Sequence, residues 1–100
     1  MVKEELISKP AVLLYFTSPD CTVCKSLKPK VRDLMSEKFP LMEMKEVNIQ
    51  ESPDTAAAFG VFTIPVILAY FDGKEFLRKV RNTGIYELEK ELSRPYSLFF

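Results

Sequence analysis

The stretch that decides the fold runs from Ala11 to Cys24 and reads AVLLYFTSPDCTVC. Its first six residues, Ala11–Phe16, form a continuous apolar run, which is typical of a central strand buried on both faces. Helical spacing of apolar residues begins at Val23, so Cys21 and Cys24 lie where a strand passes into a helix. Free N–H groups and the helix dipole favour a thiolate at such a place. The stretch therefore predicts a dithiol redox site.

Helical and extended patterns alternate along the rest of the chain. We expect a helix over 2–8, a longer amphipathic helix between Cys21 and Pro40, a strand over 42–49, a short helix over 55–59, strands over 66–71 and 74–80, and a final helix capped by Thr83. This order predicts an α/β fold in which a parallel strand–helix–strand unit is extended by an antiparallel hairpin. A mixed four-stranded sheet with helices on both faces is the natural assembly for a single domain, residues 1–100.

Local signals mark the ends of several elements. Ser52-Pro53-Asp54 is a typical helix start, and Gly60 lies where a glycine ends a helix. Asp72-Gly73 predicts a two-residue hairpin turn. In the return strand, we expect Phe76 and Val80 to share the apolar face.

Composition excludes several classes of function. The chain has 100 residues, of which 14 are basic and 14 acidic, so no surplus of positive charge indicates nucleic-acid binding. No apolar run reaches the roughly 20 residues that span a bilayer, and membrane insertion is not expected. The first residues lack the pattern of a signal peptide, which favours a cytoplasmic, reducing compartment. There a close cysteine pair is more often catalytic or metal-binding than structural.

A close cysteine pair has two other roles in proteins. A structural disulfide would close a loop of about four residues and stabilise the fold by only about 2 kcal/mol, which makes this role unfavourable. A structural zinc site needs four ligands, and one chain with two cysteines and no histidine does not supply the usual set. A zinc site shared between two chains is the metal-binding alternative.

The spacing of two prolines adds a resemblance to a known family. Pro29 stands five residues after Cys24, and Thr63-Ile64-Pro65 follows Phe59-Gly60. With these spacings and the order of elements, the chain resembles the thioredoxin family over roughly Ala11–Leu92. The resemblance implies the thioredoxin fold, thiol–disulfide exchange and a cis peptide bond before Pro65.

The chain departs from the family pattern at the redox site. The usual Trp-Cys-Gly-Pro-Cys is here Asp20-Cys-Thr-Val-Cys24. The N-terminal edge strand of the family also has no counterpart before Ala11. Glutaredoxins share this shorter build, but the chain lacks their Gly-Gly pair after the hairpin. These departures favour a dedicated range of substrates over a general one.

The two cysteines are expected to act in sequence. Cys21 is the nucleophile, because it lies exposed at the helix start, and its thiolate attacks a substrate disulfide. Cys24, one turn further and shielded, resolves the mixed disulfide in a fast intramolecular step. We expect the pKa of Cys21 to lie below the free-thiol value of about 8.5, with Lys25 supporting this shift and Asp20 opposing it.

Pro65 carries the second part of the site by resemblance. A cis bond at Ile64-Pro65 would place the Ile64 backbone beside Cys21, where it could pair with an extended substrate segment. A trans proline that merely opens a strand is the alternative. Val23, Phe62, Thr63 and Ile64 are expected to form an apolar substrate-binding rim, with ordinary packing as the alternative for Val23.

The third part of the site concerns the proton of Cys24. The family commonly has a buried aspartate six residues before the first cysteine, and that position is Tyr15 here. The lysine that partners it in the family aligns with Glu46. We hypothesise that Glu46 takes the role of the acid, that Tyr15 donates a hydrogen bond to it, and that partial burial raises the pKa of Glu46. The alternative is that Tyr15 is core and Glu46 is a solvated strand residue.

These residues predict a protein-disulfide reductase that works without a metal or bound organic cofactor. Its partners would be a disulfide-containing protein substrate and an electron donor of the thioredoxin-reductase type, and the chain would be a monomer. A thioredoxin-like module that only binds a partner, and a glutathione-linked enzyme of the glutaredoxin type, are the alternatives. The apolar end, residues 96–100, is expected to fold back over a sheet edge or helix, or to dock a partner.

Overall fold

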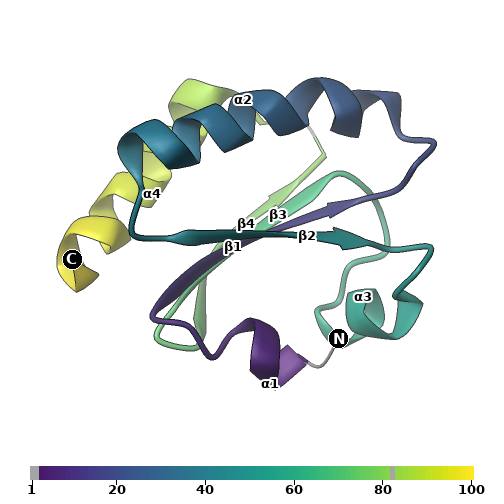
Figure 1. Cartoon of the computed structure of the whole chain (residues 1–100), viewed down its shortest axis with the longest axis horizontal. Coiled ribbons are helices and arrows are strands. Elements are labelled where there is room, and N and C mark those ends of the chain that lie inside the picture. Colours follow the sequence, from purple (N-terminus) through teal and green to yellow (C-terminus); the bar gives the residue numbers. More distant parts are fainter. Residues whose placement is uncertain (1–2, 82) are drawn as a thin grey trace.

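The helices and strands of the computed structural model follow the order that the sequence predicts (Figure 1). The structure describes residues 3–81 and 83–100. The elements are α1 (Lys3–Leu6), β1 (Ala11–Thr17), α2 (Thr22–Lys38), β2 (Glu43–Asn48), α3 (Pro53–Ala58), β3 (Val66–Phe71), β4 (Lys74–Val80) and α4 (Ile85–Phe99). Residue 2, where the first helix was expected to begin, lies outside the described residues. None of the described helices is both long enough and apolar enough to span a bilayer.

The strands form a mixed sheet in the order β2-β1-β3-β4. β1 pairs with β2 in parallel and with β3 antiparallel, and β4 pairs antiparallel with β3. This arrangement confirms the predicted α/β class and the four-stranded sheet. The described chain that precedes β1 contains the helix α1 and no strand.

The core is divided between the two faces of the sheet. Figure 1 shows α2 and α4 on one face and α1 and α3 on the other. Successive side chains of β1 point to opposite faces, so Leu13 and Tyr15 join the cluster under α2 and α4, while Val12, Leu14 and Phe16 join the other. Because both faces are covered, β1 carries the continuous apolar run that the sequence shows.

Two sharp bends have the backbone that their residues predict. Asp72 and Gly73 have φ values of 54° and 76°, as the two central residues of a type I′ hairpin turn require. Gly60 follows the end of α3 with φ of 70°, a conformation in which other residues are strained. The hairpin turn and the glycine helix end are therefore confirmed.

Two local expectations are wrong. In β4 the buried residue is Leu77, whereas Phe76 and Val80 are about half exposed. The reason is a β-bulge: Tyr70 pairs with Glu75 but Ala69 pairs with Leu77, so that Phe76 is an extra residue and the alternation changes phase.

The expected cap of the last helix is also wrong. Gly84, not Thr83, is the N-cap of α4, and it has an extended backbone with φ of −80° and ψ of 146°. The first hydrogen bond of the helix runs from the Leu88 N–H to the Gly84 carbonyl oxygen. The helix therefore begins one residue later than a cap at Thr83 would place it.

The apolar C-terminal residues extend α4 instead of forming a separate tail. The helix continues through Pro95 to Phe99. The Phe99 ring stacks on Phe71 at 5.5 Å between centroids, and the Tyr96 hydroxyl accepts a hydrogen bond from the Leu41 N–H. The segment thus packs on the sheet and on the loop after α2. These contacts favour the expectation that it folds back on the protein over the expectation that it docks a partner.

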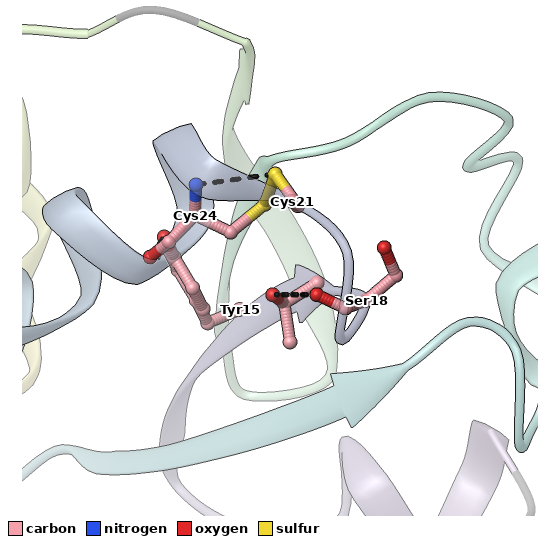
Figure 2. Close-up of a disulfide and its surroundings, with 5 residues drawn as sticks. Tyr15, Ser18, Cys21 and Cys24 are labelled. Carbon is pink, nitrogen blue, oxygen red and sulfur yellow. Dashed lines mark hydrogen bonds between the residues drawn. A yellow bond between two sulfur atoms is a disulfide. The ribbon is translucent and has the colours of Figure 1, made fainter.

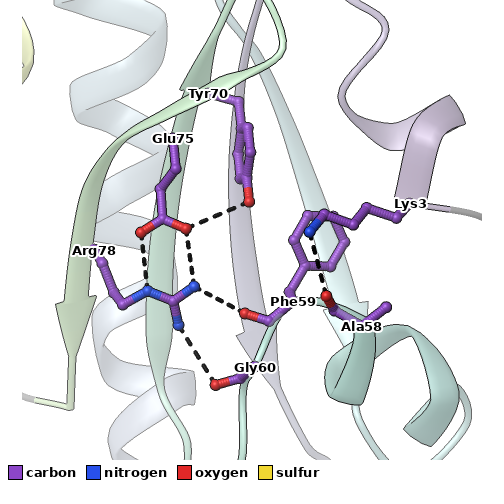
Figure 3. A network of polar contacts seen from close by, with 7 residues as sticks. All are labelled: Lys3, Ala58, Phe59, Gly60, Tyr70, Glu75 and Arg78. Carbon is purple, nitrogen blue, oxygen red and sulfur yellow. Dashed lines mark hydrogen bonds and ion pairs between the residues drawn. The ribbon is translucent and has the colours of Figure 1, made fainter.

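A polar network joins β4 to the end of α3 (Figure 3). The Arg78 guanidinium donates to the Glu75 carboxylate through Nε and Nη2, both at 2.9 Å. It also donates to the main-chain carbonyl oxygens of Phe59 at 2.8 Å and Gly60 at 3.5 Å. The hydrogen bond from Arg78 is the main reason that the pKa of Glu75 is lowered. The network fixes the start of the segment that leads from α3 to β3.

Lys3 of α1 contacts the same helix end. Its Nζ donates to the Ala58 carbonyl oxygen at 3.3 Å and lies 5.1 Å from the centroid of the Phe59 ring (Figure 3). α1 therefore helps to hold α3 against the sheet.

Arg78→Ala should lower the free energy of unfolding at pH 7 by about 1–2 kcal/mol, because Glu75 and two carbonyl groups lose a charged donor. The pKa of Glu75 is lowered in the folded protein, so its contribution is fully present above the unfolded value of 4.5 and is lost as the pH falls through the folded pKa. The difference between wild type and variant should therefore shrink at acidic pH. Urea unfolding at pH 7 and pH 3 measures both effects.

Arg32→Ala is the matched control, since Arg32 is exposed on α2 and its removal should change stability by less than about 0.5 kcal/mol. A difference between wild type and Arg78→Ala that stays constant between the two pH values would contradict the role given to Glu75.

Candidate active site

The two cysteines lie at the junction between β1 and α2, as predicted. Cys21 is the N-cap of α2, with φ of −87° and ψ of 102°, and its N–H donates to the Ser18 carbonyl oxygen. Cys21 and Cys24 are joined by a disulfide across a Cα–Cα distance of 5.2 Å (Figure 2). Cys21 is partly exposed, whereas Cys24 is 1% exposed. Only Cys21 is therefore open to a partner's sulfur.

The sulfur of Cys21 takes the place of a capping oxygen. The Cys24 N–H donates to Cys21 Sγ at 3.1 Å (Figure 2). A side-chain acceptor at the N-cap satisfies one of the free donors of the first helical turn. When the disulfide is reduced, the same donor and the helix dipole stabilise negative charge on Cys21 Sγ. The geometry thus favours Cys21 over Cys24 as the nucleophile of the pair.

The Ile64-Pro65 peptide bond is cis, as the resemblance implied. A pocket of about 300 Å³ brings this bond together with the redox pair. Its lining residues are Cys21, Thr22, Val23, Ile64, Pro65 and Arg81. Thr63 and Phe62 do not line this pocket, and Phe62 is 83% exposed. The ladder between β3 and β1 starts at Val66, so the residues before it lie beyond the paired part of the strand.

Arg81 is a site residue that sequence reasoning missed. Its N–H donates to the Pro65 carbonyl oxygen at 2.6 Å, and its φ is 66°, in the left-handed region. Nothing in the sequence singles out this position, because Arg81 simply follows the last residue of β4. It reaches the site through the antiparallel register that pairs Val80 with Val66.

Tyr15 lies beneath Cys24 but does not donate to Glu46 as expected. Its hydroxyl donates to the Cys24 carbonyl oxygen at 2.8 Å (Figure 2), and its side chain is fully buried. The pKa of Tyr15 is raised to about 12, mainly by burial and secondly by the negative charge of Glu46. Tyr15 therefore stays neutral at physiological pH and holds the first turn of α2 as a hydrogen-bond donor.

Glu46 is the neighbour of Tyr15 in the register of β1 and β2, as the sequence predicted. Its carboxylate pairs with Lys28 of α2 at 2.8 Å, and its side chain is 40% exposed. The expected hydrogen bond from Tyr15 to Glu46 is therefore not formed: the hydroxyl donates to Cys24, and the carboxylate pairs with Lys28. Lys28, like Arg81, is thus a site residue that the sequence did not suggest.

A second pocket, of about 200 Å³, lies on the β2 side of the redox pair. Its lining residues are Thr17, Ser18, Pro19, Cys24, Lys25, Lys28, Glu46 and Asn48. Cys24, although buried, therefore shares a hollow with the ion pair of Glu46 and Lys28. Among residues 3–81 and 83–100, no group of cysteine and acidic residues is arranged to hold a metal ion.

Comparison with known proteins gives consistent matches. The family model described as Thioredoxin matches residues 2–94. The chain is 37% identical to the thioredoxin-like protein YdfQ of Bacillus subtilis, over 86% of this chain and 76% of that protein. It is 32% identical to NADPH-dependent thioredoxin reductase 3 of Arabidopsis thaliana, over 73% of this chain and 14% of that protein. The structure of thioredoxin 1 from Thermosipho africanus superposes with a TM-score of 0.79 and 26% identity, covering 87% of this chain and 96% of that one.

In the reduced protein, iodoacetamide should modify Cys21 and spare the buried Cys24. The rate should rise with pH around a midpoint below the free-thiol value of about 8.5, because the helix start stabilises the thiolate. Alkylation followed by mass spectrometry between pH 4 and pH 10 measures this midpoint.

The control is the same protein in urea, where both cysteines should react alike near the free-thiol midpoint. A native midpoint at or above about 8.5, or faster modification of Cys24, would show that the assignment of the nucleophile is incorrect.

Proposed function

The chain belongs to the thioredoxin family and is a thiol–disulfide oxidoreductase, and we propose that it reduces protein disulfides in a restricted set of partners. The observation that carries the proposal is the pocket in which Cys21, at the helix start, lies beside the cis Pro65 with Cys24 buried behind it. Asp20 and Thr22-Val23, in place of the tryptophan and Gly-Pro of the family pattern, support the restricted range.

The catalytic cycle follows from the two cysteines. The Cys21 thiolate attacks one sulfur of the substrate disulfide, a Cys21–substrate bond forms, and the second sulfur leaves with the electron pair. Cys24 then loses its proton and attacks Cys21 Sγ, and the first substrate sulfur leaves as a thiolate. The substrate has gained two electrons, and the protein holds the Cys21–Cys24 disulfide that the structure contains.

Two electrons from a donor return the disulfide to the dithiol. Members of the family normally act on disulfide substrates and are reduced by a thioredoxin reductase, and a donor of this type is proposed here. A cytoplasmic location is part of the proposal, because a reductive cycle needs a reducing compartment. A monomer is also proposed, since one chain supplies every residue that lines the pocket beside Cys21.

Glu46 is proposed to accept the proton that Cys24 gives up. Cys24 and Glu46 line the same pocket, so that water in it could pass a proton between them. Lys28, at 2.8 Å from the carboxylate, keeps Glu46 oriented toward α2. Tyr15 acts as a positioning residue, because it contacts the Cys24 carbonyl group and not the reacting sulfur. Val23, Ile64, Thr63 and Phe62 are proposed to contact the substrate.

Reduction of insulin disulfides tests the main proposal. With dithiothreitol as electron donor, the wild type should accelerate precipitation of the insulin B chain, and Cys21→Ser should not, because the nucleophile is gone. Cys24→Ser should instead accumulate a mixed disulfide with insulin, since the resolving thiol is missing.

Two outcomes would favour the alternative functions. Absence of turnover in the wild type would favour a module that only binds a partner. Turnover driven by glutathione but not by a thioredoxin reductase would favour a glutathione-linked enzyme.

Glu46→Gln should slow the resolving step by at least about ten-fold at neutral pH and change its pH profile, because water alone must then take the proton of Cys24. Reduced protein mixed with 5,5′-dithiobis(2-nitrobenzoate) releases two thionitrobenzoates in succession. The first reports attack by Cys21, and the second reports attack by Cys24. Stopped-flow absorbance separates the two phases.

Glu43→Gln is the matched control, because Glu43 lies at the start of the same strand, is about half exposed, and does not line the pocket beside Cys24. An unchanged second phase in Glu46→Gln would remove Glu46 from the mechanism. A change confined to the first phase would assign the residue to Cys21 instead.

A further inference from the structure

Arg81 occupies a fixed place at the substrate-binding pocket. Its N–H donates to the carbonyl oxygen of the cis Pro65 at 2.6 Å, and it lines the pocket with Cys21 and Ile64. A φ of 66° is unusual for a residue with a β-carbon, and such conformations are common at functional sites. The backbone that carries the guanidinium is therefore tied directly to the segment that faces the reactive sulfur.

The side chain of Arg81 differs from the neighbouring cations of β4. Arg78 is paired with Glu75, and Lys79 is paired with Glu87 and Glu91 of α4. Arg81 is exposed, and among residues 3–81 and 83–100 its guanidinium has no hydrogen-bond or ion-pair partner. Its positive charge is available to a ligand.

Arg81 is also the charged member of the pocket wall. The other described residues that line it have neutral side chains in the oxidised protein: Cys21, Thr22, Val23, Ile64 and Pro65. The nearest acid in sequence to Cys21 is Asp20, which accepts a hydrogen bond from Gln50 and does not line this pocket. A partner bound along Ile64 thus meets apolar surface and one unpaired cation.

We propose that Arg81 selects protein substrates that carry an aspartate or glutamate two residues from the reactive cysteine. In an extended segment, side chains alternate between the two faces. When the substrate cysteine points at Cys21, a residue two positions away points to the same side, where a carboxylate can pair with the guanidinium. This inference rests on the proposed reductase function and adds the class of substrate.

A simpler effect of Arg81 would be to stabilise the Cys21 thiolate. That effect changes the rate with every substrate by the same factor, whereas selection changes the ratio of rates between substrates. The test therefore compares matched substrates on one protein.

The substrates are extended peptides whose single cysteine forms a mixed disulfide with thionitrobenzoate and whose residue two positions away is Glu, Gln or Lys. Cys21 attacks the peptide sulfur, thionitrobenzoate leaves with the electron pair and is measured by absorbance, and Cys24 then releases the peptide thiol. With the protein reduced beforehand and used for a single turnover, the wild type should prefer Glu over Gln by about three- to five-fold in the second-order rate constant, with Lys slowest. The preference should weaken as salt is raised.

Arg81→Gln should remove the preference, Arg81→Lys should keep part of it, and Arg81→Glu should reverse it. Lys74→Gln, which removes an exposed cation at the hairpin end of the same strand, should leave the ratio unchanged. Equal rates for the three peptides with the wild type, or a ratio that survives Arg81→Gln, would overturn the inference while leaving the reductase function standing. Reduction of oxidised glutathione in preference to the Glu peptide would also overturn it. Failure to reduce any disulfide would instead count against the proposed function.

Discussion

β1 pairs with a strand on each side and is covered by helices on each face, so the side chains from Val12 to Phe16 are entirely removed from water. Burial of each such side chain contributes about 1.5–3 kcal/mol, which fixes β1 as the central strand of the sheet. The end of β1 fixes where α2 can start. The place of Cys21 in the molecule is thus decided by the apolar run that precedes it.

The pairing partners of β1 bring the rest of the site to this point. β3 runs antiparallel to β1, so its first residues lie where β1 ends, and the cis Pro65 meets Cys21 there. β4 returns along β3 and delivers Arg81 to the same place. On the other side, β2 runs parallel to β1 and sets Glu46 beside Tyr15. Each wall of the site is therefore supplied by a different strand.

Features that depend on neighbours in sequence could be predicted, and features that depend on pairing across the sheet could not. The Cys21–Cys24 pair, the Asp72-Gly73 turn and the glycine end of α3 each carry their cause within a few residues. The burial of Leu77 instead depends on the β-bulge in the pairing of β4 with β3. The order of apolar and polar residues within β4 does not reveal this bulge. The hydrogen bond of Tyr15 depends on where the Cys24 carbonyl group of α2 lies above β1, which the sequence of β1 does not reveal.

The underside of the redox pair shows how the chain avoids a buried charge. An ionised carboxylate at the position of Tyr15 would be costly to bury and would titrate upward. Tyr15 occupies this position, stays neutral because its pKa is about 12, and donates a hydrogen bond to the Cys24 carbonyl oxygen. The acid lies instead on the neighbouring strand, 40% exposed and paired with Lys28. Tyr15 does not ionise at physiological pH, and under the proposed mechanism the proton of Cys24 passes to Glu46 through the pocket that both residues line. The fully buried position thus holds a neutral hydrogen-bond donor, and the charged carboxylate lies where solvent and Lys28 stabilise it.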